Sequence, residues 1–156
     1  MKILVPLDGT PLAESVLPHI GDLVKAPAEA VLVRVSPPIL NEAHSEGDRV
    51  VPTWEQRLGI ETRYRRYLES IGKEKLGDGF EIIAEVVFGK PAEEILRTAR
   101  EHRVDLIAMA THGRHGVSRL VHGSVAAHIL EESEIPVVLF MAPKHQTHSV
   151  SREAAE

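Results

Sequence analysis

The chain has 156 residues, of which 43% are hydrophobic and 26% charged, and it carries a formal net charge of −5 and no cysteine. This length suits one domain with a single core, and the composition is that of an ordinary globular protein. The negative charge argues against non-specific nucleic-acid binding, and the lack of cysteine excludes disulfides and thiolate metal sites. No apolar stretch approaches the length of a membrane span, so we expect no membrane partner. The lack of cysteine fits a cytoplasmic protein, and the negative charge fits one that binds no nucleic acid.

The first elements along the chain are a strand and a helix. The apolar run Lys2–Leu7 predicts a buried strand. Thr10-Pro11 then combines a capping hydroxyl with a proline at the first helical position. We expect a helix from there to about Lys25, kinked or interrupted at Pro18. Its predicted inner face consists of Leu12, Val16, Ile20 and Leu23.

A second strand is predicted over Ala30–Val35. It precedes an irregular stretch, Ser36–Pro52, whose length suits either a lid or a mobile surface loop. A long, charge-rich helix is expected from Thr53 to about Leu76. Its predicted inner face consists of Leu58, Thr62, Tyr67, Leu68 and Ile71.

The second half of the chain continues the alternation of strands and helices. Glu81 and Glu85 interrupt the apolar run Phe80–Phe88, which favours a place at the edge of a sheet. Pro91, after Gly89-Lys90, predicts the start of a helix that runs to about His102. The remaining predicted elements are a strand over Asp105–Ala110, a helix over about Val121–Ser133 and a last strand over Pro136–Ala142.

This alternation predicts a doubly wound α/β domain with a five-stranded parallel sheet, in the strand order 3-2-1-4-5. We expect the domain to cover residues 1–143 and the tail, 144–156, to be disordered because it lacks apolar periodicity. Ligands of such sheets bind outside the carboxyl ends of the strands. Asp8, Val35 and Ala110–Gly113 all fall at such ends.

A glycine-containing loop carries the functional signal. Gly113-Arg114-His115-Gly116, followed by Gly123-Ser124, lies between the strand that ends at Ala110 and the helical pattern from Val125 to Leu130. Such a loop leaves backbone N–H groups open, and the helix N-terminus adds partial positive charge. The sequence therefore predicts a phosphate site, and nucleotide binding is the first hypothesis.

A longer pattern resembles a known family. Ala110-Thr111-His112-Gly113, nine further residues and Gly123-Ser124 resemble the Gly-x-x-Gly, nine residues, Gly-Ser motif of ATP-binding universal stress proteins. Val5-Pro6-Leu7-Asp8, Gly89-Lys90-Pro91 and Ile135-Pro136-Val137-Val138 support the resemblance, which covers nearly the whole chain. One position departs from the motif: Ala110 replaces the first glycine, where a methyl group could crowd a ligand or change the backbone angle.

The resemblance implies an adenine nucleotide alpha hydrolase-like fold and a site for ATP, with Mg²⁺ or Mn²⁺ bound through the phosphates. Asp8 would contact the adenosine end, and Gly123 and Ser124 would hold the phosphates. The implied binding residues are Pro6, Leu7, Asp8, Val35, Met109, Ala110, Thr111, Gly113, Arg114, Gly123, Ser124 and Val125.

Several of these residues also allow simpler interpretations. Asp8 could cap the Gly9-Thr10 turn, and Arg114 and Arg119 could be solvated loop residues. His112, His115 and His122 form a poor metal set, because no carboxylate or thiolate lies among them. A triad of Ser124, His112 and Asp8 lacks the Gly-x-Ser-x-Gly elbow. We see no well-placed general base, so hydrolysis, if any, would be slow.

The last strand suggests a partner. Val137 to Met141 carry no charge, and an uncharged sheet edge is a template for pairing. We therefore expect a homodimer through this strand, as the resemblance also implies, with cover by the chain's own tail as the alternative. The most favoured function is an ATP-binding protein with a stress-response or regulatory role. The alternatives are a dimeric interaction module that binds no nucleotide and a sensor of another adenylate.

Overall fold

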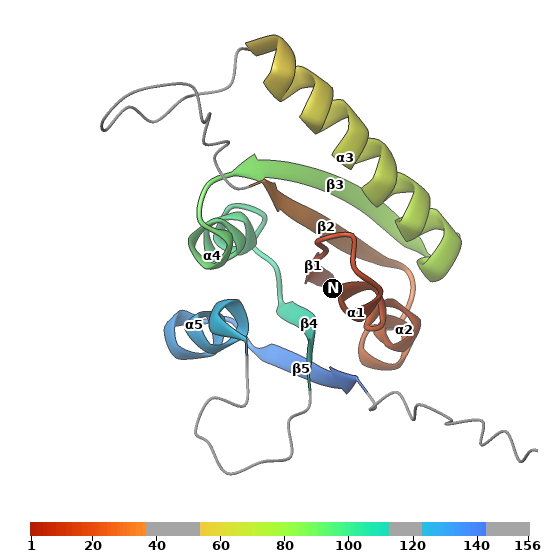
Figure 1. The fold of residues 1–156 in the computed structure, drawn as a ribbon. Helices are drawn as coiled ribbons and strands as arrows, with labels where there is room; N and C mark the ends of the chain where they lie inside the picture. The colour runs from red at the N-terminus through yellow and green to blue at the C-terminus, as the bar shows by residue number, and fades with distance from the viewer. Residues whose placement is uncertain (37–53, 113–122, 143–156) are drawn as a thin grey trace, which may run out of the picture.

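The computed structural model describes residues 1–36, 54–112 and 123–142. Five parallel strands form one sheet in the order β3-β2-β1-β4-β5, which confirms the predicted fold (Figure 1). The strands are β1 (Lys2–Pro6), β2 (Ala28–Ser36), β3 (Phe80–Phe88), β4 (Leu106–His112) and β5 (Val137–Ala142). The predicted loop after Ser36 and the predicted disordered tail lie outside the described residues.

Helices cover both faces of this sheet, so the central strands are buried on both sides. One face carries α1 (Pro11–Glu14), the short 3-10 helix η1 (Leu17–His19), α2 (Ile20–Leu23) and α3 (Trp54–Leu76). The other carries α4 (Pro91–Glu101) and α5 (Ser124–Glu132). Ile3, Leu4 and Val5 of β1 are all fully buried, and they alternate between the two cores. None of the described helices is both long and apolar enough to cross a membrane.

The predicted first helix is broken into three short pieces. Thr10 caps α1 as expected, because its hydroxyl oxygen accepts a hydrogen bond from the Ala13 N–H at 3.2 Å. Pro18 lies inside η1, so the expected interruption is confirmed. The break turns Leu17 and Val24 into the core beside Val16 and Ile20.

The predicted inner face of α3 is partly wrong. Leu68 is fully buried, but Leu58 is 56% exposed, and Thr62 is also exposed. At 3.6 residues per turn, Leu58 is rotated by about 80° from Leu68 around the helix axis. Tyr64 packs against the sheet instead, one turn before Leu68.

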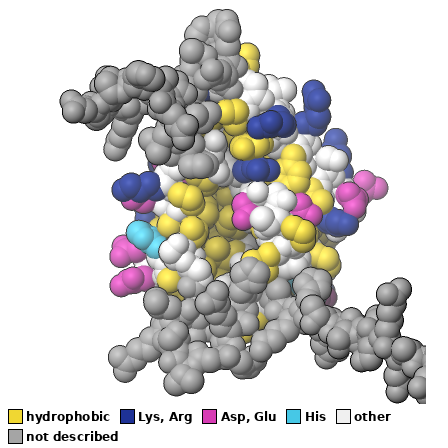
Figure 2. All heavy atoms as spheres, in the orientation of Figure 1, with side chains coloured by type: hydrophobic (Ala, Val, Ile, Leu, Met, Phe, Trp, Pro, Cys, Tyr) yellow, Lys and Arg dark blue, Asp and Glu magenta, His cyan; other side chains and the backbone are white. Residues whose placement is uncertain are grey.

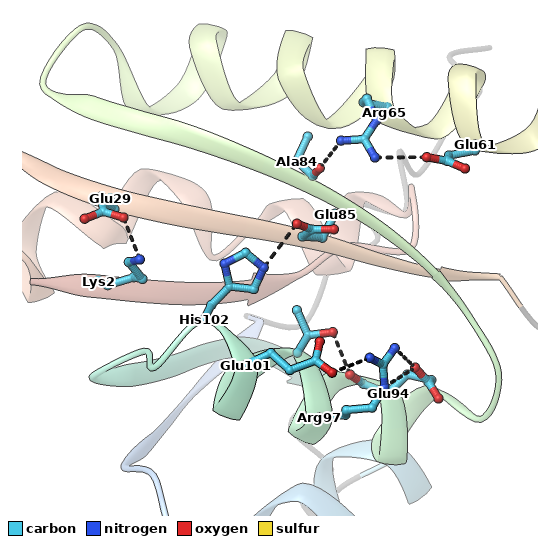
Figure 3. Close-up of polar contacts among 11 residues, drawn as sticks. Lys2, Glu29, Glu61, Arg65, Ala84, Glu85, Glu94, Arg97, Glu101 and His102 are labelled. Atoms are coloured by element: carbon cyan, nitrogen blue, oxygen red, sulfur yellow. Dashed lines mark hydrogen bonds and ion pairs between the residues drawn. The ribbon is translucent and has the colours of Figure 1, made fainter. Parts of the chain in front are cut away.

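The edge position predicted for β3 is confirmed. Arg65 of α3 covers part of this edge, because its Nη1 donates a hydrogen bond to the backbone oxygen of Ala84 at 2.5 Å (Figure 3). Its Nη2 pairs with Glu61 at 3.0 Å. A backbone acceptor occupied by an arginine is no longer free for another strand, so this contact protects the β3 edge.

Close packing of α3 on the sheet depends on Gly72. A Cβ atom added there would lie 2.8 Å from Cδ1 of Leu32 and 2.9 Å from Cγ2 of Ile82. Neither core side chain can move without disturbing its neighbours. Gly72 therefore allows the helix to approach β2 and β3 closely.

We expect Gly72→Ala to lower the free energy of unfolding by roughly 1–3 kcal/mol, because it overpacks the core. The matched control is Gly59→Ala on the same helix, where an added Cβ meets nothing within 4 Å. This control should raise stability by about 0.5–1 kcal/mol. Urea denaturation of both variants measures the difference, and equal effects at the two glycines would contradict the packing assignment.

Candidate functional site

The candidate site is a cleft at the carboxyl edge of the sheet. It has a volume of about 500 Å³, which lies within the range of small-molecule sites. Figure 2 shows hydrophobic side chains gathered in the hollow at the centre of this face. The cleft is lined by Pro6, Leu7, Asp8, Thr10, Leu12, Ala13, Val33, Val35, Pro91, Ile95, Met109, Ala110, Thr111, Gly123, Val125 and Ala126.

The cleft opens because β1 and β4 diverge after a short paired segment. β1 pairs with β2 from Lys2 to Pro6, but it pairs with β4 only at Ile3 and Leu4. β4 continues to His112 in register with β5. The two strands therefore diverge beyond Leu4, and their ends form opposite walls of the cleft. This is the topological switch point, where sheets of this class bind ligands.

Most of the lining is apolar. Val33 and Val35 alternate with Arg34 along β2, so both valines face the α4 side of the sheet. Leu7 lies on the α1 side, and Met109 continues the wall on β4. A flat, weakly polar group such as a nucleobase fits a wall of this kind.

Polar side chains are few in this lining: Asp8, Thr10 and Thr111. The Asp8 carboxylate accepts two hydrogen bonds at Oδ1, from the Thr10 N–H at 2.9 Å and from the Thr10 hydroxyl at 2.6 Å. Asp8 therefore caps the turn between β1 and α1, as its simpler interpretation predicts. It also faces the cleft, so the cap and a ligand contact are compatible.

Two helix N-termini reach the cleft from the α4 and α5 side. Pro91 begins α4, and Gly123 is the N-cap of α5. The first hydrogen bond of α5 runs from the Ala127 N–H to the Gly123 oxygen at 2.9 Å. The three N–H groups between them therefore have no helical acceptor. Together with the partial positive charge of two helix ends, they favour an anion at this end of the cleft.

The cleft brings together most of the sequence-predicted site residues. Ser124 is the exception among the described ones: it is the first residue of α5, next to the lining residue Gly123, but it does not line the cleft. The lining residues that were predicted are Pro6, Leu7, Asp8, Val35, Met109, Ala110, Thr111, Gly123 and Val125. Gly113 and Arg114 lie outside the described residues, as do Arg119, His115 and His122. No group of three possible metal ligands occurs among the described residues.

Sequence reasoning missed seven lining residues: Thr10, Leu12, Ala13, Val33, Pro91, Ile95 and Ala126. Strand alternation could have found Val33, two positions before Val35. Thr10, Leu12 and Ala13 were assigned only to helix formation, but the short α1 places them beside the cleft. Ile95 and Ala126 gave no functional signal, because each has the pattern of an ordinary core residue.

Ala110 requires no unusual backbone. It lies inside β4, opposite Phe140 of β5, and it is not among the residues with positive φ. The replaced glycine of the motif therefore introduces no backbone strain here. Its methyl group takes a place in the cleft lining, so crowding of a ligand is the effect that remains.

These features define a doubly wound α/β domain with a ligand cleft at its switch point. The model of the universal stress protein family matches residues 1–140, and the chain belongs to that family. The chain is 29% identical over 149 residues to universal stress protein MJ0531 of Methanocaldococcus jannaschii, covering 93% of this chain and 84% of that one.

Solved structures agree with this assignment. The structure of MJ0577 from the same organism has a TM-score of 0.69 at 26% identity, over 92% of this chain and 96% of that one. A universal stress protein in complex with cAMP has a TM-score of 0.63 at 17% identity, over 90% and 96%. A family protein from Arabidopsis thaliana with AMP bound has a TM-score of 0.60 at 15% identity, over 96% and 97%. The last two establish the fold alone.

The capping role of Asp8 can be measured without a ligand. Asp8→Ala removes the acceptor of both Thr10 bonds, so we expect the free energy of unfolding to fall by about 1 kcal/mol. Asp8→Asn keeps an acceptor oxygen and should lose less. The control is Asp22→Ala, at an exposed aspartate of α2. Urea denaturation in which Asp8→Ala and Asp22→Ala lose the same stability would refute this role.

Proposed function

We propose that this chain binds an adenine nucleotide, with ATP as the first candidate, and acts in the cytoplasm as a nucleotide-dependent stress-response or regulatory protein. One observation carries the proposal: a single cleft joins an apolar wall to the N-termini of two helices. This combination matches a ligand with a flat apolar end and a strongly anionic end. The family assignment and the AMP and cAMP complexes of relatives support the same class of ligand.

In the proposed complex, the adenine lies against Pro6, Leu7 and Val35, and Asp8 contacts the adenosine end. Met109, Ala110 and Thr111 pass close to the ribose and the phosphates. The phosphates lie at the start of α5, where the N–H groups of Ser124 and Val125 have no helical acceptor. The family resemblance adds Gly113 and Arg114 to this end.

A divalent ion, Mg²⁺ or Mn²⁺, fits this site only through the nucleotide. Asp8 is the single carboxylate in the described lining, and it belongs to the proposed adenosine end. The ion would therefore bind phosphate oxygens, where it neutralises their charge. The described lining offers no general base beside the start of α5, so we propose binding with at most slow hydrolysis.

Gly123→Val tests the phosphate assignment. Among the described residues, an added Cβ meets nothing within 4 Å, so the fold should persist while the side chain blocks the phosphates. We expect the ATP affinity measured by titration calorimetry with Mg²⁺ to fall at least roughly tenfold, which corresponds to about 1.4 kcal/mol. The control is Gly59→Val at an exposed position of α3, which introduces the same side chain away from the described lining and should bind as the wild type does.

Two outcomes would contradict the proposal. Unchanged ATP affinity in Gly123→Val would remove the phosphate assignment. No heat from the wild type at millimolar ATP would favour the alternative of an interaction module without nucleotide. Mass spectrometry of small molecules released from the denatured protein distinguishes ATP from another adenylate, which would favour a sensor of AMP or a cyclic nucleotide.

We also propose that two copies of the chain pair through β5. This strand is the second edge of the sheet and carries no charge, and its Met141 is 59% exposed. At the opposite edge, Arg65 donates a hydrogen bond to a backbone oxygen of β3. Among the described residues, no side chain makes such a bond to the backbone of β5. An open, uncharged edge strand favours pairing with a partner.

Light scattering at micromolar concentration tests this pairing. We expect the wild type to have a dimeric mass and Met141→Lys to have a monomeric mass, because charge on an edge strand opposes pairing. Leu130→Lys is the matched control, since Leu130 is 41% exposed on α5 and lies outside the edge strand. A monomeric wild type would overturn the proposal.

A further inference from the structure

Arg34 lies behind the candidate cleft, where no motif predicts a functional residue. Its neighbours Val33 and Val35 line the cleft, so the alternation of β2 sends Arg34 to the opposite face, toward α3. There the guanidinium carbon lies 3.7 Å from the ring centroid of Tyr64 and 5.4 Å from that of Tyr67. Within the part of the chain that the structure describes, no carboxylate lies within 4.0 Å of Arg34.

The guanidinium also packs against the turn between β1 and α1. A Cβ atom added to Gly9 would lie 2.8 Å from Nη1 of Arg34, so glycine leaves the space that the guanidinium fills. Gly9 also has φ of +82°, which favours glycine for a second reason. The guanidinium thus lies beside both the Tyr64 ring and the turn at Gly9.

A second contact holds α1, the helix that follows this turn. The Tyr67 hydroxyl donates a hydrogen bond to Oε1 of Glu14 at 2.7 Å, which connects α3 to the end of α1. Burial raises the pKa of Tyr67 above its ordinary value of 10.0, and the bond to Glu14 raises it further. The phenol therefore remains a donor over the whole neutral range.

Asp8 and Thr10, the polar residues at the adenosine end of the proposed site, flank Gly9 in the turn beside Arg34. We propose that Arg34 is a positioning residue for this turn: it holds Gly9 in place and so fixes the Asp8 carboxylate in the cleft without touching the ligand. The inference rests on the proposed function. It assigns to Arg34 of β2, together with Tyr64 of α3, a role in selecting the nucleoside end of the ligand, although neither is among the described lining residues.

The test compares Arg34→Met with Arg63→Met. Arg63 also lies over the Tyr64 ring, at 5.3 Å from the centroid, but it belongs to α3 and not to the sheet beside the turn. We expect Arg34→Met to weaken ATP and adenosine equally, by roughly two- to tenfold, the range for residues that act through another. Its affinity for inorganic triphosphate should not change, and Arg63→Met should bind all three ligands as the wild type does.

A second readout needs no ligand. The Thr10 amide donates to Asp8, so its hydrogen exchange, measured by NMR, reports the order of the turn. We expect faster exchange in Arg34→Met, and also in Tyr64→Leu, which removes the ring over which the guanidinium lies. Circular dichroism establishes that each variant is folded.

The outcomes separate this inference from the proposed function. If the wild type binds no nucleotide, the proposed function fails, and the exchange rates still decide whether Arg34 orders the turn. If the wild type binds ATP but Arg34→Met keeps full adenosine affinity, the positioning role is overturned. Equal weakening of adenosine and triphosphate would also overturn it, because that result indicates a general structural effect.

Discussion

The limited pairing between β1 and β4 is the constraint on which the cleft depends. Two residues of β1 pair with β4, whereas the pairing of β1 with β2 continues to Pro6. The central strand is buried on both faces, so its residues are fixed by packing and cannot shift to close the gap. A rigid sheet thus supports an opening whose walls are the ends of its own strands.

The helices give the two ends of this cleft different chemistry. On one side, the N-termini of α4 and α5 point at the cleft and favour the binding of anions. On the other side, α1 is only four residues long, and its contribution is the Asp8–Thr10 turn that precedes it. Arg34 of β2 lies beside that turn and over Tyr64 of α3, and Tyr67 of α3 holds the end of α1. The site is therefore a product of both helical layers.

The two edges of the sheet also differ in their side chains and contacts. On β3, acidic residues and the Arg65 contact make the edge unsuitable for another strand. The β5 edge carries only apolar side chains, several of them partly buried against both cores. The homodimer proposal rests on this difference between the two edges. The cleft lies between the edges and is open.

Local signals in the sequence determined the element types, the strand limits to within two residues, and the residues at the carboxyl ends of β1 and β4. Continuous apolar runs and the Thr10-Pro11 start act over a few residues, so they can be read directly. Only the tertiary structure decided the rotation of α3, which exposes Leu58, and the contact of Arg34 with Gly9. It also decided which core-like residues, such as Ile95, line the cleft. These features join segments that are distant in the chain, and packing between layers fixes them, so no local pattern records them.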